Sequence, residues 1–284
     1  MERTSEPLEI RSIRRIVRHW PFPRGKGLLL KAFSPLLRSR EFVFEIADGV
    51  LVMADMDDWI TVHGFVEGYD VDFSKSWALI RWGGTVIDVG ANIGIWAIGA
   101  ARRVGPRGTV HAFEPLETNF SRLIPNIELN RISNIVPQRL ALMDHAGSLK
   151  FFPSPNKNSG VGRVVTDEWQ GPHCTVDAVT LDAYCERHGI TSVDLLKLDV
   201  EGAEYFVLKG ASKLLGSKKP PTIIFEVERV MTTQLNYSPE DLEVFLAKFD
   251  YSVCALRSGE WQPISLNGFS GPEDLLAIPP TLSQ

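Results

Sequence analysis

The sequence has few cysteines, no long apolar run and no large excess of charge of one sign, and each absence excludes a class of protein. Its three cysteines, Cys174, Cys185 and Cys254, form no CxxC pair, so neither a disulfide framework nor a zinc motif is expected. No stretch approaches the roughly 18 apolar residues of a membrane span, and the N-terminus has no apolar signal core. A net charge of −5 provides no overall basic field that would attract nucleic acid. We therefore expect a soluble, cytoplasmic protein without a nucleic-acid partner.

The length of 284 residues exceeds the roughly 100–200 residues of a typical domain and fits one α/β domain with an N-terminal extension. We expect residues 1–40 to form a basic amphipathic extension, residues 41–82 a β-hairpin and helix subdomain, and residues 83–284 the main domain. Within the main domain, residues 148–179 are rich in proline, asparagine and glycine. This composition predicts an insertion that forms a hairpin or a mobile loop over a site.

The N-terminal extension contains a helix with two different faces. Ile10, Ile13, Val17 and Trp20 fall on one side of this helix, and arginines occupy much of the remaining surface. Such a helix either packs on its own domain or binds a membrane surface or a partner. Residues 8–20 are therefore a candidate peripheral membrane contact.

Hydrophobic patterning predicts the elements of the two remaining parts. The Asp48-Gly49 pair indicates a hairpin between two β-rich runs. The elements expected around it are strands at 42–46, 50–54 and 59–63 and a helix at 73–82. From Gly84 onward strands and helices alternate, which predicts a parallel sheet with helices on both faces. The expected strands are 85–88, 109–113, 135–139, 193–198, 222–227, 250–256 and 273–278, and the expected helices are 92–103, 116–129, 180–188, 203–215 and 238–248.

The most informative segment, Val86–Gly94, reads VIDVGANIG and predicts a buried strand, a tight glycine turn and a helix. Such a turn binds nucleotides because the helix N-terminus and the bare backbone of Gly90 can approach a ligand closely. The pattern is G-x-N-x-G rather than G-x-G-x-x-G, and Asp88 would repel a pyrophosphate. A carboxylate there suits a cationic group, such as the amino acid part of S-adenosylmethionine.

A second carboxylate supports a nucleoside site. Glu114 ends the next expected strand, twenty residues after Gly94. At that distance it can accept hydrogen bonds from both ribose hydroxyls. The alternative is a Rossmann-like turn that binds another nucleotide, or none.

A further group of charged residues follows two later strands. Lys197 interrupts the apolar strand LLKL, and its burial would be costly unless it pairs with a carboxylate such as Asp199. The fourth strand neighbours the first in a doubly wound sheet, so Asp199 is expected close to the glycine turn. Glu201 follows it, and Glu226 ends the next strand. The alternatives are a structural Lys–Asp pair, a helix N-terminal role for Glu201, and a capping or loop role for Glu226.

With these segments in view, the chain resembles the FkbM family of S-adenosylmethionine-dependent methyltransferases over roughly residues 64–279. The family pattern combines a VIDVGANIG-type segment with the FEP, TLD, LKLDVEGAE…LKGA and FEV segments and a DLLAIP ending. In this chain the later five are Phe113–Pro115, Thr180–Asp182, Leu196–Ala211, Phe225–Val227 and Asp274–Pro279.

The resemblance implies a class I methyltransferase (Rossmann-like) fold, with a seven-stranded, mostly parallel sheet whose last strand is antiparallel. It implies S-adenosylmethionine as cofactor and O-methylation of a hydroxyl on a sugar, a glycan or a secondary metabolite. Glu67 occupies the family's glutamate position before the first strand, with Val66 in place of the usual aromatic residue. Asp144 is implied near the exocyclic amine of the adenine. The other implied cofactor contacts are Asp88, Gly90, Asn92, Gly94, Glu114 and Ala141, with Leu142 beside the adenine.

For the chemistry, we consider Asp199, Glu201 and Glu226 as base or substrate-orienting groups, with Lys197 as their cationic neighbour and His173 as an outside candidate. Asp199 also counts among the expected cofactor contacts. Two carboxylates from one segment are too few ligands for a convincing Mg²⁺ site, so no metal is expected. The rival hypotheses are an NAD-dependent Rossmann oxidoreductase and a non-catalytic cofactor-binding module, and the oligomeric state stays open.

Overall fold

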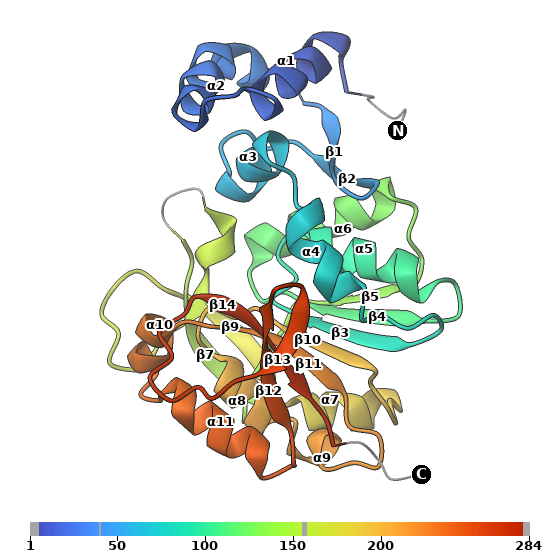
Figure 1. The fold of residues 1–284 in the computed structure, drawn as a ribbon, viewed down its shortest axis with the longest axis vertical. Coiled ribbons are helices and arrows are strands. Elements are labelled where there is room, and N and C mark those ends of the chain that lie inside the picture. Colours follow the sequence, from blue (N-terminus) through green and yellow to red (C-terminus); the bar gives the residue numbers. More distant parts are fainter. Residues whose placement is uncertain (1–5, 40, 155–157, 281–284) are drawn as a thin grey trace.

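The structure is a computed structural model that describes residues 6–39, 41–154 and 158–280 (Figure 1). The remaining residues belong to the predicted extension, insertion and main domain and lie outside the described part. No helix in the described part is long and apolar enough to cross a membrane.

An eight-stranded sheet forms the centre of the main domain, in the order β13-β12-β14-β11-β10-β3-β4-β5. The strands at the centre of this sheet are parallel, and the pairing becomes antiparallel toward one edge. This arrangement confirms the expected α/β class. The parallel strands are β3 (Thr85–Val89), β4 (Thr109–Phe113), β5 (Ile135–Gln138), β10 (Leu195–Leu198) and β11 (Thr222–Val227). The last strand, β14 (Glu273–Ile278), runs antiparallel between β11 and β12 (Ser252–Arg257).

The eighth strand, β13 (Glu260–Pro263), was not predicted from the sequence. It pairs with the end of β12 as an antiparallel hairpin. Ser258 and Gly259 both adopt positive φ angles, of 53° and 88°, and turn the chain between the two strands. Such left-handed pairs match the twist of a two-residue hairpin, and the Ser-Gly pair was the available signal.

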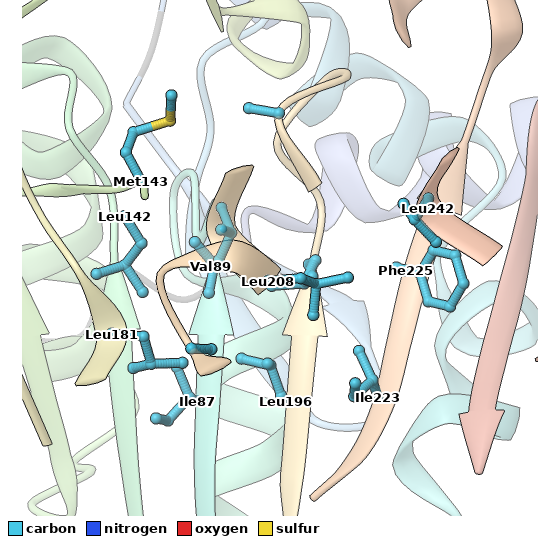
Figure 2. Close-up of a cluster of buried hydrophobic side chains, with 14 of the residues drawn as sticks. Ile87, Val89, Leu142, Met143, Leu181, Leu196, Leu208, Ile223, Phe225 and Leu242 are labelled. Carbon is cyan, nitrogen blue, oxygen red and sulfur yellow. The ribbon is translucent and has the colours of Figure 1, made fainter. Parts of the chain in front are cut away.

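Helices cover both faces of the sheet because the strands are apolar on both sides. On β3, Val86 packs with the core that includes α5 (Ile95–Val104) and α6 (Glu117–Leu129), whereas Ile87 and Val89 face the opposite core. Figure 2 shows this opposite core, where Leu196, Ile223 and Phe225 from adjacent strands meet Leu208 and Leu242. The helices of this second face are α7 (Leu181–His188), α8 (Glu204–Lys209), α9 (Ser212–Leu215) and α11 (Pro239–Ala247), and α10 (Arg229–Gln234) follows β11.

The insertion forms most of a second, four-stranded sheet in the order β6-β9-β7-β8. The predicted hairpin is present as the antiparallel pair β7 (Gly147–Phe152) and β8 (Arg163–Val164), and β9 (Cys174–Val179) also pairs antiparallel with β7. The other member is β6 (Ala141–Leu142), and a 3₁₀ turn, η1 (Ser159–Val161), precedes β8.

The N-terminal part begins with α1 and α2 as a layer at one end of the molecule and continues to α4, which lies against α5 beside the sheet (Figure 1). Its elements are α1 (Leu8–Arg18), α2 (Pro23–Arg38), β1 (Val43–Ala47), β2 (Val50–Met53), α3 (Trp59–Val66) and α4 (Asp70–Trp77). β1 and β2 form the expected hairpin. The predicted helix at 73–82 lies earlier in the chain as α4 and ends before the Gly83-Gly84 pair.

One element was predicted wrongly: residues 59–63 form helix α3, not a strand. Its buried residues are Thr61, Gly64, Phe65 and Val66, and the i, i+3, i+4 spacing of the first three is helical. The β-branched and aromatic residues of WITVHGFV suggested a strand, but packing on β1 outweighs that propensity. The ring of Phe65 lies edge-on to that of Phe44, 5.3 Å away.

Candidate active site

A cavity of about 360 Å³ opens at the carboxyl ends of the central parallel strands. This is the edge where α/β sheets form ligand sites. The two groups of residues singled out in the sequence both contribute to its wall. The lining segments are Val89–Ile93 after β3, Phe113–Leu116 after β4, Leu140–Leu142 at β6, Asn158–Gly162 around η1 and Asp199–Glu201 after β10, together with Glu226 on β11 and residues of α3 and α4.

The glycine turn has a geometry that requires its residue types. Gly90 has a φ of 83°, and a Cβ atom on it would lie 1.8 Å from the backbone oxygen of Asp199. Asn92 is also left-handed, with a φ of 52°. Gly94 does not line the cavity, but a Cβ there would lie 2.4 Å from Leu123, so it allows α5 to start against α6. The turn therefore brings bare backbone to the cavity wall beside the end of β10.

Glu114 points toward this turn. Its carboxylate accepts hydrogen bonds from the backbone N–H of Asn92 and of Leu116, both at 2.9 Å, and from the side-chain amide of Asn119 at 3.4 Å. Burial raises the pKa of Glu114 to about 7, an effect that these donors only partly offset. A carboxylate held in this way beside a glycine turn can accept the hydroxyls of a nucleoside sugar.

Lys197 pairs with two carboxylates beneath the cavity. Its Nζ lies 3.0 Å from Asp88 Oδ1 and 3.3 Å from Asp199 Oδ2. Burial opposes the charge of Lys197, but the two carboxylates outweigh it and raise its pKa. Asp88 is fully buried and lies outside the cavity lining, whereas Lys197 and Asp199 contribute to the wall. The cation thus joins the strand of the glycine turn to the acidic end of the cavity.

Glu201 and Glu226 line the same cavity, close to Asp199. Burial, followed by the charge of Asp199, raises the pKa of Glu201 to about 8 and that of Glu226 to about 7. Glu201 also adopts a φ of 52°, which is uncommon for a residue with a side chain. These pKa values lie near neutral pH, where a carboxylate can accept and release a proton efficiently.

The remaining predicted contacts divide between the wall and its surroundings. Ala141 lines the cavity with Leu142, whereas Asp144 lies outside the lining, where it binds Lys209 Nζ at 2.8 Å. Glu67 is also outside the lining: it ends α3 and pairs with Lys26 at 2.8 Å. His173 lies on an exposed loop away from the cavity wall.

Sequence reasoning missed a set of hydrogen bonds that joins the N-terminal part to the insertion beside the cavity. Asp58 is buried before α3 and accepts hydrogen bonds from the backbone N–H of Ser159, at 2.9 Å, and from Arg122, at 3.1 Å. The Ser159 carbonyl accepts from the side-chain amides of Asn92, at 2.8 Å, and Asn119, at 3.2 Å. No local pattern marks these long-range partners.

An aromatic wall from α3 and α4 was also missed. Trp59, Tyr69 and Phe73 line the cavity together with Trp96 of α5. Trp96 Nε1 donates to the hydroxyl of Ser76 at 2.9 Å, which fixes its ring. These rings give the cavity a largely apolar wall, and Lys197 Nζ lies 5.5 Å from the centroid of the Trp96 ring. Across the described residues, no group of three or more histidine, cysteine, aspartate or glutamate side chains is arranged to hold a metal ion.

Comparison with known proteins gives a consistent assignment. The sequence model of the methyltransferase FkbM domain matches residues 88–253. The hexuronic acid methyltransferase AglP of Haloferax volcanii is 32% identical over 130 residues, which cover 46% of this chain and 51% of that protein. The 31-O-demethyl-FK506 methyltransferase FkbM of Streptomyces tacrolimicus is 31% identical over 159 residues, covering 46% and 60%.

The chain therefore spans about half the length of the curated relatives it matches. Among solved structures, a SAM-dependent methyltransferase from Aquifex aeolicus is similar at a TM-score of 0.40 and 16% identity, covering 73% of this chain and 87% of that one.

Proposed function

Since the chain belongs to the FkbM family of methyltransferases, we propose that it transfers the methyl group of S-adenosylmethionine to a hydroxyl oxygen of a sugar, glycan or secondary-metabolite acceptor. Two relatives support this acceptor class by name, since one acts on a hexuronic acid and the other on 31-O-demethyl-FK506. The hydroxyl acceptor, the cofactor and the residue roles below all belong to this proposal.

The residues of the cavity fit the cofactor. Gly90 lines the cavity without a side chain, so a ligand can approach its main chain there. Glu114 would hold the ribose hydroxyls, and Ala141 and Leu142 would contact the adenine. Asp199 would face the positively charged amino end. Bound in this way, S-adenosylmethionine would supply a methyl group carried on a cationic sulfur, with a neutral thioether as the leaving group.

In the reaction, the residues of this chain would align the acceptor and remove its proton. The acceptor oxygen must lie in line with the methyl carbon, and such alignment can contribute up to about 7–11 kcal/mol. As the oxygen forms its bond to the methyl carbon, its proton passes to a carboxylate, which we assign to Glu226 with Glu201 as its neighbour. Proton removal of this kind typically contributes about 10²–10⁴-fold.

A single observation carries the proposal. One cavity joins a carboxylate fixed beside a glycine turn, Glu114, to carboxylates whose pKa values lie near neutrality, Glu201 and Glu226. The first suits a nucleoside and the others suit an acceptor hydroxyl, so cofactor and acceptor would meet in the same space.

The test begins with ligand-induced thermal stabilisation by S-adenosylhomocysteine and by NAD. We expect S-adenosylhomocysteine alone to raise the Tm. Stabilisation by NAD alone would favour the oxidoreductase and contradict the proposal.

The second stage is an acceptor screen with labelled S-adenosylmethionine, for which we expect label on a hydroxyl oxygen. If the chain binds S-adenosylhomocysteine but labels no acceptor in a broad panel of sugars, glycans and metabolites, it is a non-catalytic binding module instead.

A further inference from the structure

The helix pair α1–α2 has an inner face fixed to the domain. Ile10, Ile13 and Val17 are buried there. Arg14 donates to the backbone oxygen of Glu45 at 2.8 Å, and Arg18 donates to that of Gly64 at 2.7 Å. The pair is therefore held in a set orientation, as a layer at one end of the molecule (Figure 1).

The outer surface of this layer is unusually apolar. Five of the eleven large apolar side chains exposed in the described residues lie between residues 8 and 28. Their exposed fractions are 75% for Leu8, 48% for Ile16, 38% for Trp20, 66% for Phe22 and 72% for Leu28. On α1, Leu8 and Ile16 lie away from the buried stripe. Trp20 and Phe22 lie in the connection that leads into α2.

Cations accompany these apolar side chains. Residues 1–40 contain ten lysines and arginines against three acidic residues, although the whole chain has a net charge of −5. Arg15 on α1 and Lys31 on α2 are both exposed, and no side chain in the described part of the chain pairs with either. The rest of the chain is acidic, so the molecule is strongly polarised toward this end.

We infer that the outer surface of α1–α2 docks on a lipid bilayer that carries anionic headgroups. Exposed apolar and aromatic side chains beside lysine and arginine suit the boundary between headgroups and acyl chains. Cations near an anionic leaflet add attraction, and the acidic remainder of the chain favours docking through this end alone. A nucleic acid would use the cations but not Leu8, Phe22 and Leu28, so the bilayer accounts for more of the surface.

The helix pair that carries the docking surface packs beside one wall of the cavity. α1 contacts α3, and Trp59 and Ile60 of α3 line the cavity wall. A bilayer bound to the outer surface of α1–α2 would therefore be separated from the cavity by the helix pair and α3. This inference stands on the surface of α1–α2 and does not depend on the chemistry of the cavity.

The test is co-sedimentation of the full chain with vesicles of phosphatidylcholine alone or of phosphatidylcholine mixed with phosphatidylglycerol. We expect binding to the mixed vesicles that weakens as salt is raised, because salt screens surface charge. The variant R15Q/K31Q should bind roughly 25-fold more weakly, about fivefold for each cation removed. The variant L8S/F22S/L28S should bind at least roughly tenfold more weakly.

Matched controls lie elsewhere on the surface. Lys213, with a side chain 81% exposed, and Trp82 and Val244, 63% and 62% exposed, lie outside the helix pair. K213Q and W82S/V244S should bind mixed vesicles like the parent. All variants should keep the parent far-UV circular dichroism and Tm, since their side chains are exposed.

Several results would overturn the inference. The first two are no binding to the mixed vesicles and equal losses of binding in the control variants. The third is binding of a duplex oligonucleotide in preference to vesicles. The fourth is a chain that does not bind vesicles but forms a concentration-dependent dimer, which L8S/F22S/L28S abolishes.

Discussion

The two ends of the cavity hold carboxylates with the same raised pKa but different surroundings. Burial raises the pKa of both Glu114 and Glu226 to about 7. Glu114 accepts three hydrogen bonds, two of them from backbone N–H groups. In the described part of the chain no donor hydrogen-bonds to the carboxylate of Glu226. The first end is thus built to hold a ligand in place, whereas the second leaves a half-buried carboxylate free to exchange a proton.

Replacement of Glu226 should give the largest difference between the effect on catalysis and the effect on cofactor binding. We expect E226Q to lower kcat by roughly 10²–10⁴-fold, because a glutamine cannot accept the acceptor proton. The affinity for S-adenosylhomocysteine should stay at the parent value, since Glu114 is intact. Steady-state kinetics with a labelled methyl donor and calorimetric titration measure the two quantities.

Glu260, exposed on β13, is the matched control for this variant. E260Q should retain the parent kcat. Retention of full activity by E226Q would remove Glu226 from the reaction.

Lys197 lies between the ends, and its loss should destabilise the fold. K197M leaves the fully buried Asp88 without its partner, and breaking a buried pair costs about 3–5 kcal/mol. Urea unfolding should show this loss in the free energy of unfolding. The double variant D88N/K197M should recover most of it, because no buried charge then lacks a partner. If the single and double variants lose equally, the pair is not the source of the stability.

Replacement of Glu114 should affect binding rather than chemistry. Hydrogen bonds to a charged group contribute about 1.5–3 kcal/mol, so E114Q should bind S-adenosylhomocysteine roughly 10- to 100-fold more weakly. At saturating cofactor its kcat should remain close to the parent value. E117Q is the control, since Glu117 lies nearby in the first turn of α6 with a side chain 66% exposed. An unchanged affinity in E114Q would place the ribose elsewhere.

The smallest expected effect is a shift in the pH profile. With proton acceptors of pKa about 7 and about 8, kcat/KM should rise with pH and level off above about pH 9, because the carboxylates must be ionised. The charge of Asp199 raises both pKa values. D199N should therefore move the rising limb to lower pH by roughly half a unit. A shift to higher pH would show that Asp199 acts on the profile through another group.

Sequence reasoning succeeded where the determining contacts are local. Strands β3, β4 and β11 were expected at these positions, because each reads as an apolar run with a carboxylate at or next to its end, Asp88, Glu114 and Glu226. The Lys197–Asp199 contact also followed from the cost of a buried cation. In each case a few neighbouring residues contain the physical argument.

The failures involve residues that meet only after folding. Asp58, Asn119 and Ser159 are joined by hydrogen bonds that span 40 to 101 positions in the chain, so no spacing rule marks them. Helix α3 was predicted as a strand from its β-branched and aromatic residues, because the packing on β1 that favours the helix does not show in the local sequence. The aromatic residues that line the cavity come together through the packing of α3 and α4 on the domain, so the local sequence did not predict them either.

The most direct test of the two-ended cavity is a crystal structure of the chain with S-adenosylhomocysteine. The account predicts ribose hydroxyls within hydrogen-bond distance of the Glu114 carboxylate and the sulfur facing the space beside Glu201 and Glu226. A ligand in the reverse orientation, with its ribose at Glu226, or one bound outside this cavity, would contradict it.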